Sequence, residues 1–142
     1  MKNLKNIRQY QNIEILTAGR VRLVIMLYDG IIRFNKLAVQ AIGQGDTGDR
    51  NHYINRSLDI IMELLNSLNM EEGGEVAGNL QRLYNFSISQ LLLANIKKTV
   101  APIETVTRIV SELKTGWEAI AKQGTAQTRA GVEKLKTVSC GA

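Results

Sequence analysis

The sequence contains very little proline and few aromatic residues, and each shortage narrows the range of folds. Only one of the 142 residues is proline, Pro102, so long helices can run without the break that an internal proline imposes. Aromatic residues make up 5% of the chain, whereas strand-rich sandwiches favour aromatic and β-branched residues. Because a chain of this length can bury one substantial core without staples, we predict a single all-α domain.

Cysteine is equally scarce. The single cysteine, Cys140, excludes an internal disulfide and indicates a reducing compartment. We interpret it as an exposed thiol without a catalytic role, because a reactive thiolate needs a base and a shaped pocket. The sequence has no run of 18 apolar residues and no signal-like apolar segment near its start. These observations predict a cytoplasmic protein that does not insert into a membrane.

Residue patterns with catalytic or metal-binding chemistry are also lacking. The only histidine, His52, falls on the polar side of a predicted helix, and no second ligand accompanies it at a metal-binding spacing. The glycines Gly43, Gly45 and Gly48 lack the Gly-Lys-Ser/Thr ending of a phosphate-binding loop. We therefore expect no enzymatic activity, no metal and no other cofactor.

The net charge of +5 is distributed unevenly along the chain. Residues 1–43 carry seven basic and two acidic side chains, whereas residues 44–75 carry two basic and seven acidic ones. An acid-rich segment inside the domain would repel phosphate, and no stripe of arginine and lysine alternates with aromatic residues. The charge pattern therefore argues against nucleic acid as a partner.

Glycine- and proline-containing stretches divide residues 17–122 into four segments, each long enough for a bundle helix. Because the connections are short, consecutive helices should be antiparallel. Thr17 and Asp49 are the predicted N-caps of the first two helices. Flanking the bundle domain, 17–122, we expect a mobile N-terminal segment, 1–16, and a weakly structured C-terminal tail, 123–142. The predicted helices span 19–42, 50–69, 76–98 and 101–122, and a weak helix is expected over 125–136.

Three of the four predicted helices carry more apolar residues than one bundle core requires. Besides a core line, the second and third helices each have an apolar shoulder beside that line. Contiguous surplus apolar surface can be a homodimer interface, a helix buried on several sides, or a groove for an amphipathic partner helix. The shoulder positions are Ile60, Leu64, Ile88, Leu92 and Ile96.

Five stretches of the sequence resemble the FliS family of flagellar export chaperones, in the family's order and at similar separations. The resemblance implies a cytoplasmic bundle that binds the disordered C-terminal region of flagellin, prevents premature polymerisation and delivers flagellin to the gate of the flagellar type III export apparatus. It also implies that the N-terminal segment, where Leu4, Ile7 and Tyr10 recur every three residues, lies against the bundle until the client binds. The stretches are MLYDGIIRF (26–34), LDIIMELLNSLNME (58–71), GGEVAGNLQRLYNF (73–86), LLLANIKK (91–98) and LKTGWEAI (113–120).

Several residues in these stretches have competing interpretations. For Tyr28 and Trp117 we favour packing in the core, and for Gly30 the close approach of a neighbouring helix. The amide of Asn95 can bind an extended client backbone or satisfy the loop that follows its helix. Our client-binding candidates are Tyr10, Ile60, Leu64, Ile88, Leu92, Asn95 and Ile96.

Two alternative functions remain open. The same groove could serve another client of the export pathway, which would make the protein an adaptor. The surplus apolar surface could instead be the interface of a homodimeric structural bundle, and a weak homodimer could form in the absence of client.

Overall fold

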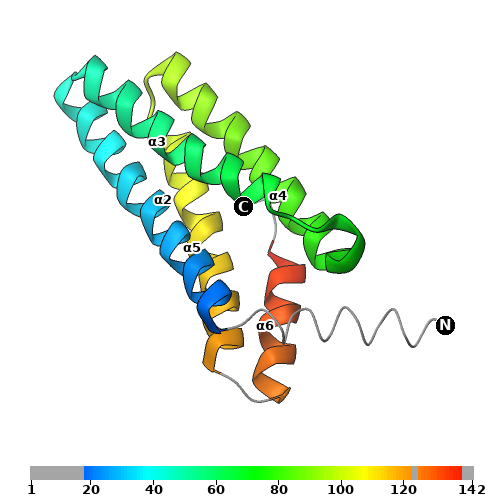
Figure 1. The fold of residues 1–142 in the computed structure, drawn as a ribbon. Helices are drawn as coiled ribbons and strands as arrows, with labels where there is room; N and C mark the ends of the chain where they lie inside the picture. Colours follow the sequence, from blue (N-terminus) through cyan, green and yellow to red (C-terminus); the bar gives the residue numbers. More distant parts are fainter. Residues whose placement is uncertain (1–17, 123–124, 139–142) are drawn as a thin grey trace.

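The computed structural model describes residues 18–122 and 125–138, and all regular structure in these ranges is helical. Four long helices lie side by side in antiparallel order, and a shorter helix packs at one end (Figure 1). The predicted all-α antiparallel four-helix bundle is therefore confirmed. The segment 1–16 with Tyr10, the cap candidate Thr17, and Cys140 lie outside the described residues. The helices are α2 (Ala18–Gln44), α3 (Thr47–Asn66), α4 (Met70–Lys97), α5 (Ala101–Lys122) and α6 (Thr125–Thr137).

Helix α3 begins three residues earlier than the predicted cap would allow. Gly45 follows α2 with a φ of 71°, a left-handed conformation that glycine adopts without steric cost. The next residue, Asp46, caps α3 by accepting a hydrogen bond from the backbone N–H of Asp49 at 2.9 Å. The prediction of Asp49 as the cap is therefore wrong. Asp49 lies in the first turn instead, where its charge suits the helix dipole.

Helix α4 includes Gly73 and Gly74, which precede the start predicted for this helix. Asn69 caps the helix by accepting from the N–H of Glu72 at 3.0 Å, so α4 begins six residues before the predicted start at 76. Gly74, with φ 54° and ψ −128°, interrupts the helical geometry and produces a kink. At the other end Lys98 adopts a left-handed conformation and its N–H bonds to the carbonyl of Ala94.

The core of the bundle contains a hydrogen-bonded chain of aromatic side chains. The hydroxyls of Tyr28 and Tyr84 lie 2.6 Å apart, and the indole N–H of Trp117 donates to the Tyr28 hydroxyl at 3.0 Å. All three side chains are buried, which confirms the core placement of Tyr28 and Trp117. Because burial disfavours the phenolate, it raises the pKa of both tyrosines well above the ordinary value.

A second buried polar group joins three helices. The Ser57 hydroxyl of α3 donates to Asn35 Oδ1 of α2 at 2.7 Å, and Asn35 Nδ2 donates to Thr107 Oγ1 of α5 at 3.0 Å. Near the surface of the same α2–α5 contact, Lys114 Nζ lies 2.6 Å from Asp29 Oδ1. The hydrogen bond to Asp29 raises the pKa of Lys114.

Gly30 permits a close contact between α2 and α3. A Cβ added to Gly30 would lie 3.1 Å from Ile60 Cδ1 of α3, which is tighter than ordinary van der Waals contact. The interpretation of Gly30 as a packing residue is therefore confirmed.

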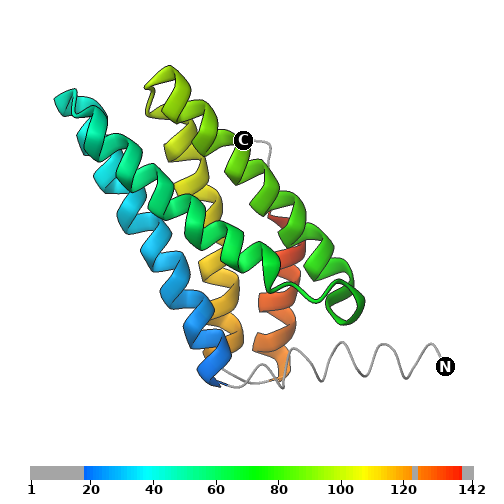
Figure 2. The same ribbon diagram turned by 45° about the horizontal axis from the view of Figure 1, so that its top comes forward.

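The weak helix expected over 125–136 is present as α6, and it belongs to the core. In both views α6 lies beside the C-terminal half of α5 (Figures 1 and 2). Leu135 and Val138 are 1% and 6% exposed and join the same apolar cluster as the bundle helices. The sequence did not indicate this packing, because few large apolar residues anchor α6: Val132 and Leu135 within the helix and Val138 directly after it.

Candidate functional site

The C-terminal half of α4 presents a set of large apolar side chains to solvent. Leu92, Leu93 and Ile96 are 47%, 36% and 77% exposed, although the adjacent residues Leu91 and Ala94 are fully buried. Residues three and four apart are neighbours on a helix surface, so these three side chains form one patch, which we call the α4 apolar face. The predicted exposure of Leu92 and Ile96 is confirmed, whereas Leu93 was not among the candidates.

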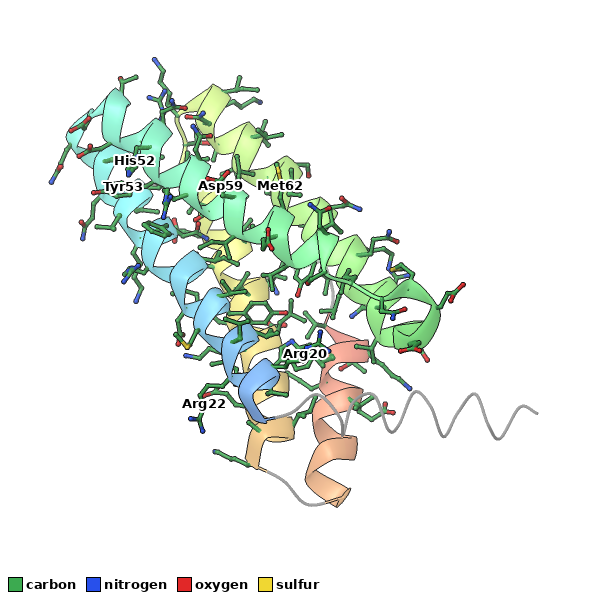
Figure 3. All side chains as sticks on the ribbon, in the orientation of Figure 1. Arg20, Arg22, His52, Tyr53, Asp59 and Met62 are labelled. Atoms are coloured by element: carbon green, nitrogen blue, oxygen red, sulfur yellow. The ribbon has the colours of Figure 1, made fainter. Side chains whose placement is uncertain are left out.

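The apolar face borders a surface shared with α3. Asn95 Nδ2 donates to Asn51 Oδ1 at 2.9 Å, so Asn51 lies on the side of α3 that faces α4. Met62 follows Asn51 by eleven residues, a spacing that returns to nearly the same side of a helix, and it is 44% exposed. Figure 3 labels Met62 on the side of α3 nearer α4. Together with half-buried Ile88, this side chain extends the apolar surface beyond α4.

Asn95 closes this surface near the start of α3. Its side-chain oxygen accepts from Arg50 Nε at 3.0 Å while its amide nitrogen donates to Asn51. Both functional groups of the amide are therefore engaged with α3. Its partners in the free protein therefore belong to α3 and not to the loop after α4, and client binding by Asn95 stays a prediction.

The two shoulder residues predicted on α3 point in another direction. The tip of Ile60 lies against Gly30 of α2 and its side chain is half-buried. Leu64, four residues later, is 3% exposed and belongs to the core cluster, so the prediction that it stands outside the core is wrong. The structure therefore brings together Ile88, Leu92, Asn95 and Ile96 on α4, but not the two α3 candidates with them.

The missed residues share one reason. Met62 lies in the segment IIMELL and Leu93 in the run LLLA, where closely spaced apolar residues fall on several sides of the helix and the pattern does not show which side a neighbouring helix covers. The exposure of Met62 depends on which sides of α3 are covered by α2 and α4. The positions of neighbouring helices belong to the tertiary structure and cannot be obtained from the residue pattern of one helix.

Two lysines follow the apolar face at the end of α4. Lys97 lies in the last turn of α4, where a cation suits the helix dipole, and Lys98 follows it as the C-cap. His52 is exposed, and its ring packs edge-on against Tyr53 near the start of α3 (Figure 3). In the part of the chain that the structure describes, no group of three or more metal-ligating side chains converges. None of the described helices is long and apolar enough to cross a membrane.

A helical bundle with an exposed apolar helix face has the architecture of helical proteins that bind another polypeptide. Comparison with known proteins gives the family. The profile of the family described as "Flagellar protein FliS" matches residues 2–124. This chain belongs to the FliS family, whose members are flagellar secretion chaperones and not enzymes.

Curated relatives support the same assignment over most of the chain. The flagellar secretion chaperone FliS of Campylobacter jejuni is 37% identical over 99 residues, covering 70% of this chain and 77% of the relative. That of Vibrio cholerae is 33% identical over 107 residues, or 75% and 79% of the two chains. The flagellar secretion chaperone FliSB of Pseudomonas aeruginosa is 30% identical over 125 residues, or 85% and 99%.

Proposed function

We propose that this protein is a cytoplasmic chaperone that binds the C-terminal region of flagellin and holds it in a form competent for export. The observation that carries the proposal is the α4 apolar face, where Leu92, Leu93 and Ile96 remain exposed beside fully buried neighbours. Membership of the FliS family supports flagellin as the client, and the names of the curated relatives identify them as secretion chaperones.

The proposed chaperone action replaces apolar contacts between flagellin molecules by apolar contacts between flagellin and this protein. Flagellin's terminal segments self-associate through amphipathic helices, so covering their apolar sides would prevent premature polymerisation. A client that lies over a shallow surface of α3 and α4 remains extended enough to enter a narrow channel. The binding energy comes from burying apolar surface, so the cycle needs no nucleotide. Delivery then requires a contact with a component of the export gate.

The client-binding residues of the proposal are those on the α4 side: Ile88, Leu92, Asn95 and Ile96. Met62 and Leu93 join them because they extend the same exposed surface. Ile60 lies against α2, so a client reaches it only through the outer side of the α2–α3 contact. Tyr10 remains a proposed contact within the N-terminal segment.

Calorimetric titration of the purified protein with a peptide of the flagellin C-terminal region tests the proposal. We expect saturable one-to-one binding that weakens when Ile96 is replaced by Ser, while exchange of the exposed Glu104 in the first turn of α5 for Gln leaves it unchanged. Light scattering in the same buffer identifies the alternatives. A client-free dimer that the Ile96→Ser change dissociates, with no peptide binding, would show that the apolar face is a homodimer interface.

A further inference from the structure

Helix α6 lies beyond the part of the chain that defines the family. The family match ends at residue 124, and α6 begins at Thr125. Nevertheless α6 packs against both α5 and α4, parallel to α4 and beside the C-terminal half of α5 (Figures 1 and 2). We call the surface of α4 and α5 that α6 covers the seat. In this chain a segment of the same polypeptide occupies it.

The contact between α5 and α6 is unusually close because two glycines meet. A Cβ at Gly131 would lie 2.7 Å from the carbonyl oxygen of Gly116, and a Cβ at Gly116 would lie 3.0 Å from Leu135 Cδ2. Leu135 then fills the adjoining space and is 1% exposed. The helix that binds the seat thus presents a glycine, Gly131, and a leucine four residues later, Leu135, to α5.

The seat also holds a polar group directed at the end of the bound helix. Asn79 of α4 is 5% exposed, and its amide donates to the carbonyl oxygen of Leu135. Leu135 belongs to the last turn of α6, where carbonyls have no donor within the helix. Arg82 donates to Asn79 Oδ1 at 3.1 Å and so holds the amide in the orientation that faces α6.

The seat is continuous with the proposed client surface. Asn79, Phe86 and Leu93 recur every seven residues on α4, so they lie along one side of the helix. Asn79 contacts α6, whereas Phe86 is only half-buried and Leu93 is exposed. The line occupied by α6 therefore continues past its end at Thr137 toward the α4 apolar face.

We propose that α6 is an exchangeable occupant of a helix-binding groove between α4 and α5, and that a client helix displaces it. The partner is an amphipathic helix with a small residue facing Gly116, a leucine four positions later, and a terminal carbonyl for Asn79. Its identification as flagellin rests on the proposed function. In the free protein α6 keeps this groove from unspecific contacts, and its release lengthens the surface available to the client.

A substitution within α6 tests the displacement without altering the groove. Gly131→Val places a side chain against the Gly116 carbonyl and forces α6 off, although valine favours helix more than glycine does. Lys134→Val introduces the same residue on the exposed side of α6 and serves as the control. Leu135→Ala is a second releasing variant. Hydrogen exchange of the α6 amides reports release, and circular dichroism reports that α2 to α5 remain folded.

The first probe is the flagellin C-terminal peptide, titrated into full-length variants. We expect Gly131→Val and Leu135→Ala to bind it about tenfold more tightly than wild type, the gain expected if the groove is open in a tenth of wild-type molecules. The Lys134→Val control should match wild type. Equal affinities for all four proteins would overturn the proposal. Binding to none of them would instead overturn the proposed function.

The second probe tests the displacement of α6 independently of flagellin binding. A synthetic peptide of residues 123–138 should bind the full-length Gly131→Val variant and not the wild type, because only the variant has a vacant groove. It should also compete with the client peptide on that variant. If the synthetic peptide does not bind the Gly131→Val variant, the groove between α4 and α5 does not bind a separate helix and the proposal is wrong.

Discussion

The hydroxyl oxygen of Tyr28 is shared by two partners, Tyr84 at 2.6 Å and the indole N–H of Trp117 at 3.0 Å. These partners come from α4 and α5, so one atom of α2 links three helices in the core. Tyr28 and Tyr84 also meet edge to face, with ring centroids 6.5 Å apart. The loss of one hydroxyl therefore affects more than one helix contact.

Removing the shared hydroxyl should destabilise the bundle more than removing its neighbour. In Tyr28→Phe, both the Trp117 N–H and the Tyr84 hydroxyl lose their hydrogen bond to the Tyr28 hydroxyl, at a cost of about 1–3 kcal/mol for each buried group left unsatisfied. In Tyr84→Phe, Tyr28 still accepts from Trp117 and only one bond is lost. Urea denaturation followed by circular dichroism measures the difference. Equal losses would contradict the central role of Tyr28.

Alkaline pH should unfold the protein through the same pair. Burial raises the pKa of Tyr28 and of Tyr84 above the unfolded value near 10, so the stability that the neutral phenols contribute is complete below about pH 10. As the pH rises further, the unfolded state loses protons first and the free energy of unfolding falls by up to about 1.4 kcal/mol per pH unit for each tyrosine. The Tyr84→Phe variant should show a shallower decline in alkaline denaturation curves.

Two adjacent leucines on α4 should respond in opposite ways to the same charge. Leu92 is 47% exposed, so Leu92→Glu should fold normally and weaken flagellin peptide binding by about 1–3 kcal/mol. Leu91 is fully buried, and Leu91→Glu should destabilise the domain by more than about 4 kcal/mol. Thermal denaturation and calorimetry separate the two effects. If Leu92→Glu proved as unstable as Leu91→Glu, the α4 apolar face would be part of the core.

The buried Asn35 amide should stabilise the bundle because it provides hydrogen bonds to buried groups of α3 and α5. Asn35→Ala removes the acceptor of Ser57 and the donor to Thr107, so we expect a loss of about 2–4 kcal/mol. In Ser57→Ala, Asn35 keeps its bond to Thr107, and the loss should be smaller. Chemical denaturation gives both values. A larger loss for Ser57→Ala than for Asn35→Ala would show that packing around Ser57, and not the amide, holds this contact.

The sequence predicted the presence of each bundle helix, but it did not predict where some of these helices start. The range predicted for α5 equals the observed Ala101–Lys122, because Pro102 and the preceding loop leave little choice of start. For α3, Asp46 and Asp49 are equally good caps as residue types. Gly45 decides between them, since it ends α2 immediately before Asp46, and only the observed backbone shows that.

The candidate site was predictable on α4 and not on α3. Helix α4 presents Leu92 and Ile96 well away from its core side, so spacing alone separates them from Leu91. Helix α3 packs against α2 and against α4. Leu64 falls inside the arc that these neighbours bury, and Met62 falls outside it. A helical wheel shows the periodicity of a helix but not where its neighbours lie.

The order in which the helices pack also has a kinetic consequence. Consecutive helices contact each other from α2 to α6, and the contact between α2 and α5 is the one that joins the two ends of the four-helix ring. Most pairings can therefore form as local hairpins at low entropic cost, which is typical of rapidly folding proteins. The α2–α5 seam, with Asn35 against Thr107 and Asp29 against Lys114, requires the longest loop to close. Folding of this chain is then limited by one long-range closure, and mutations in that seam should slow folding more than equally destabilising mutations between sequence neighbours.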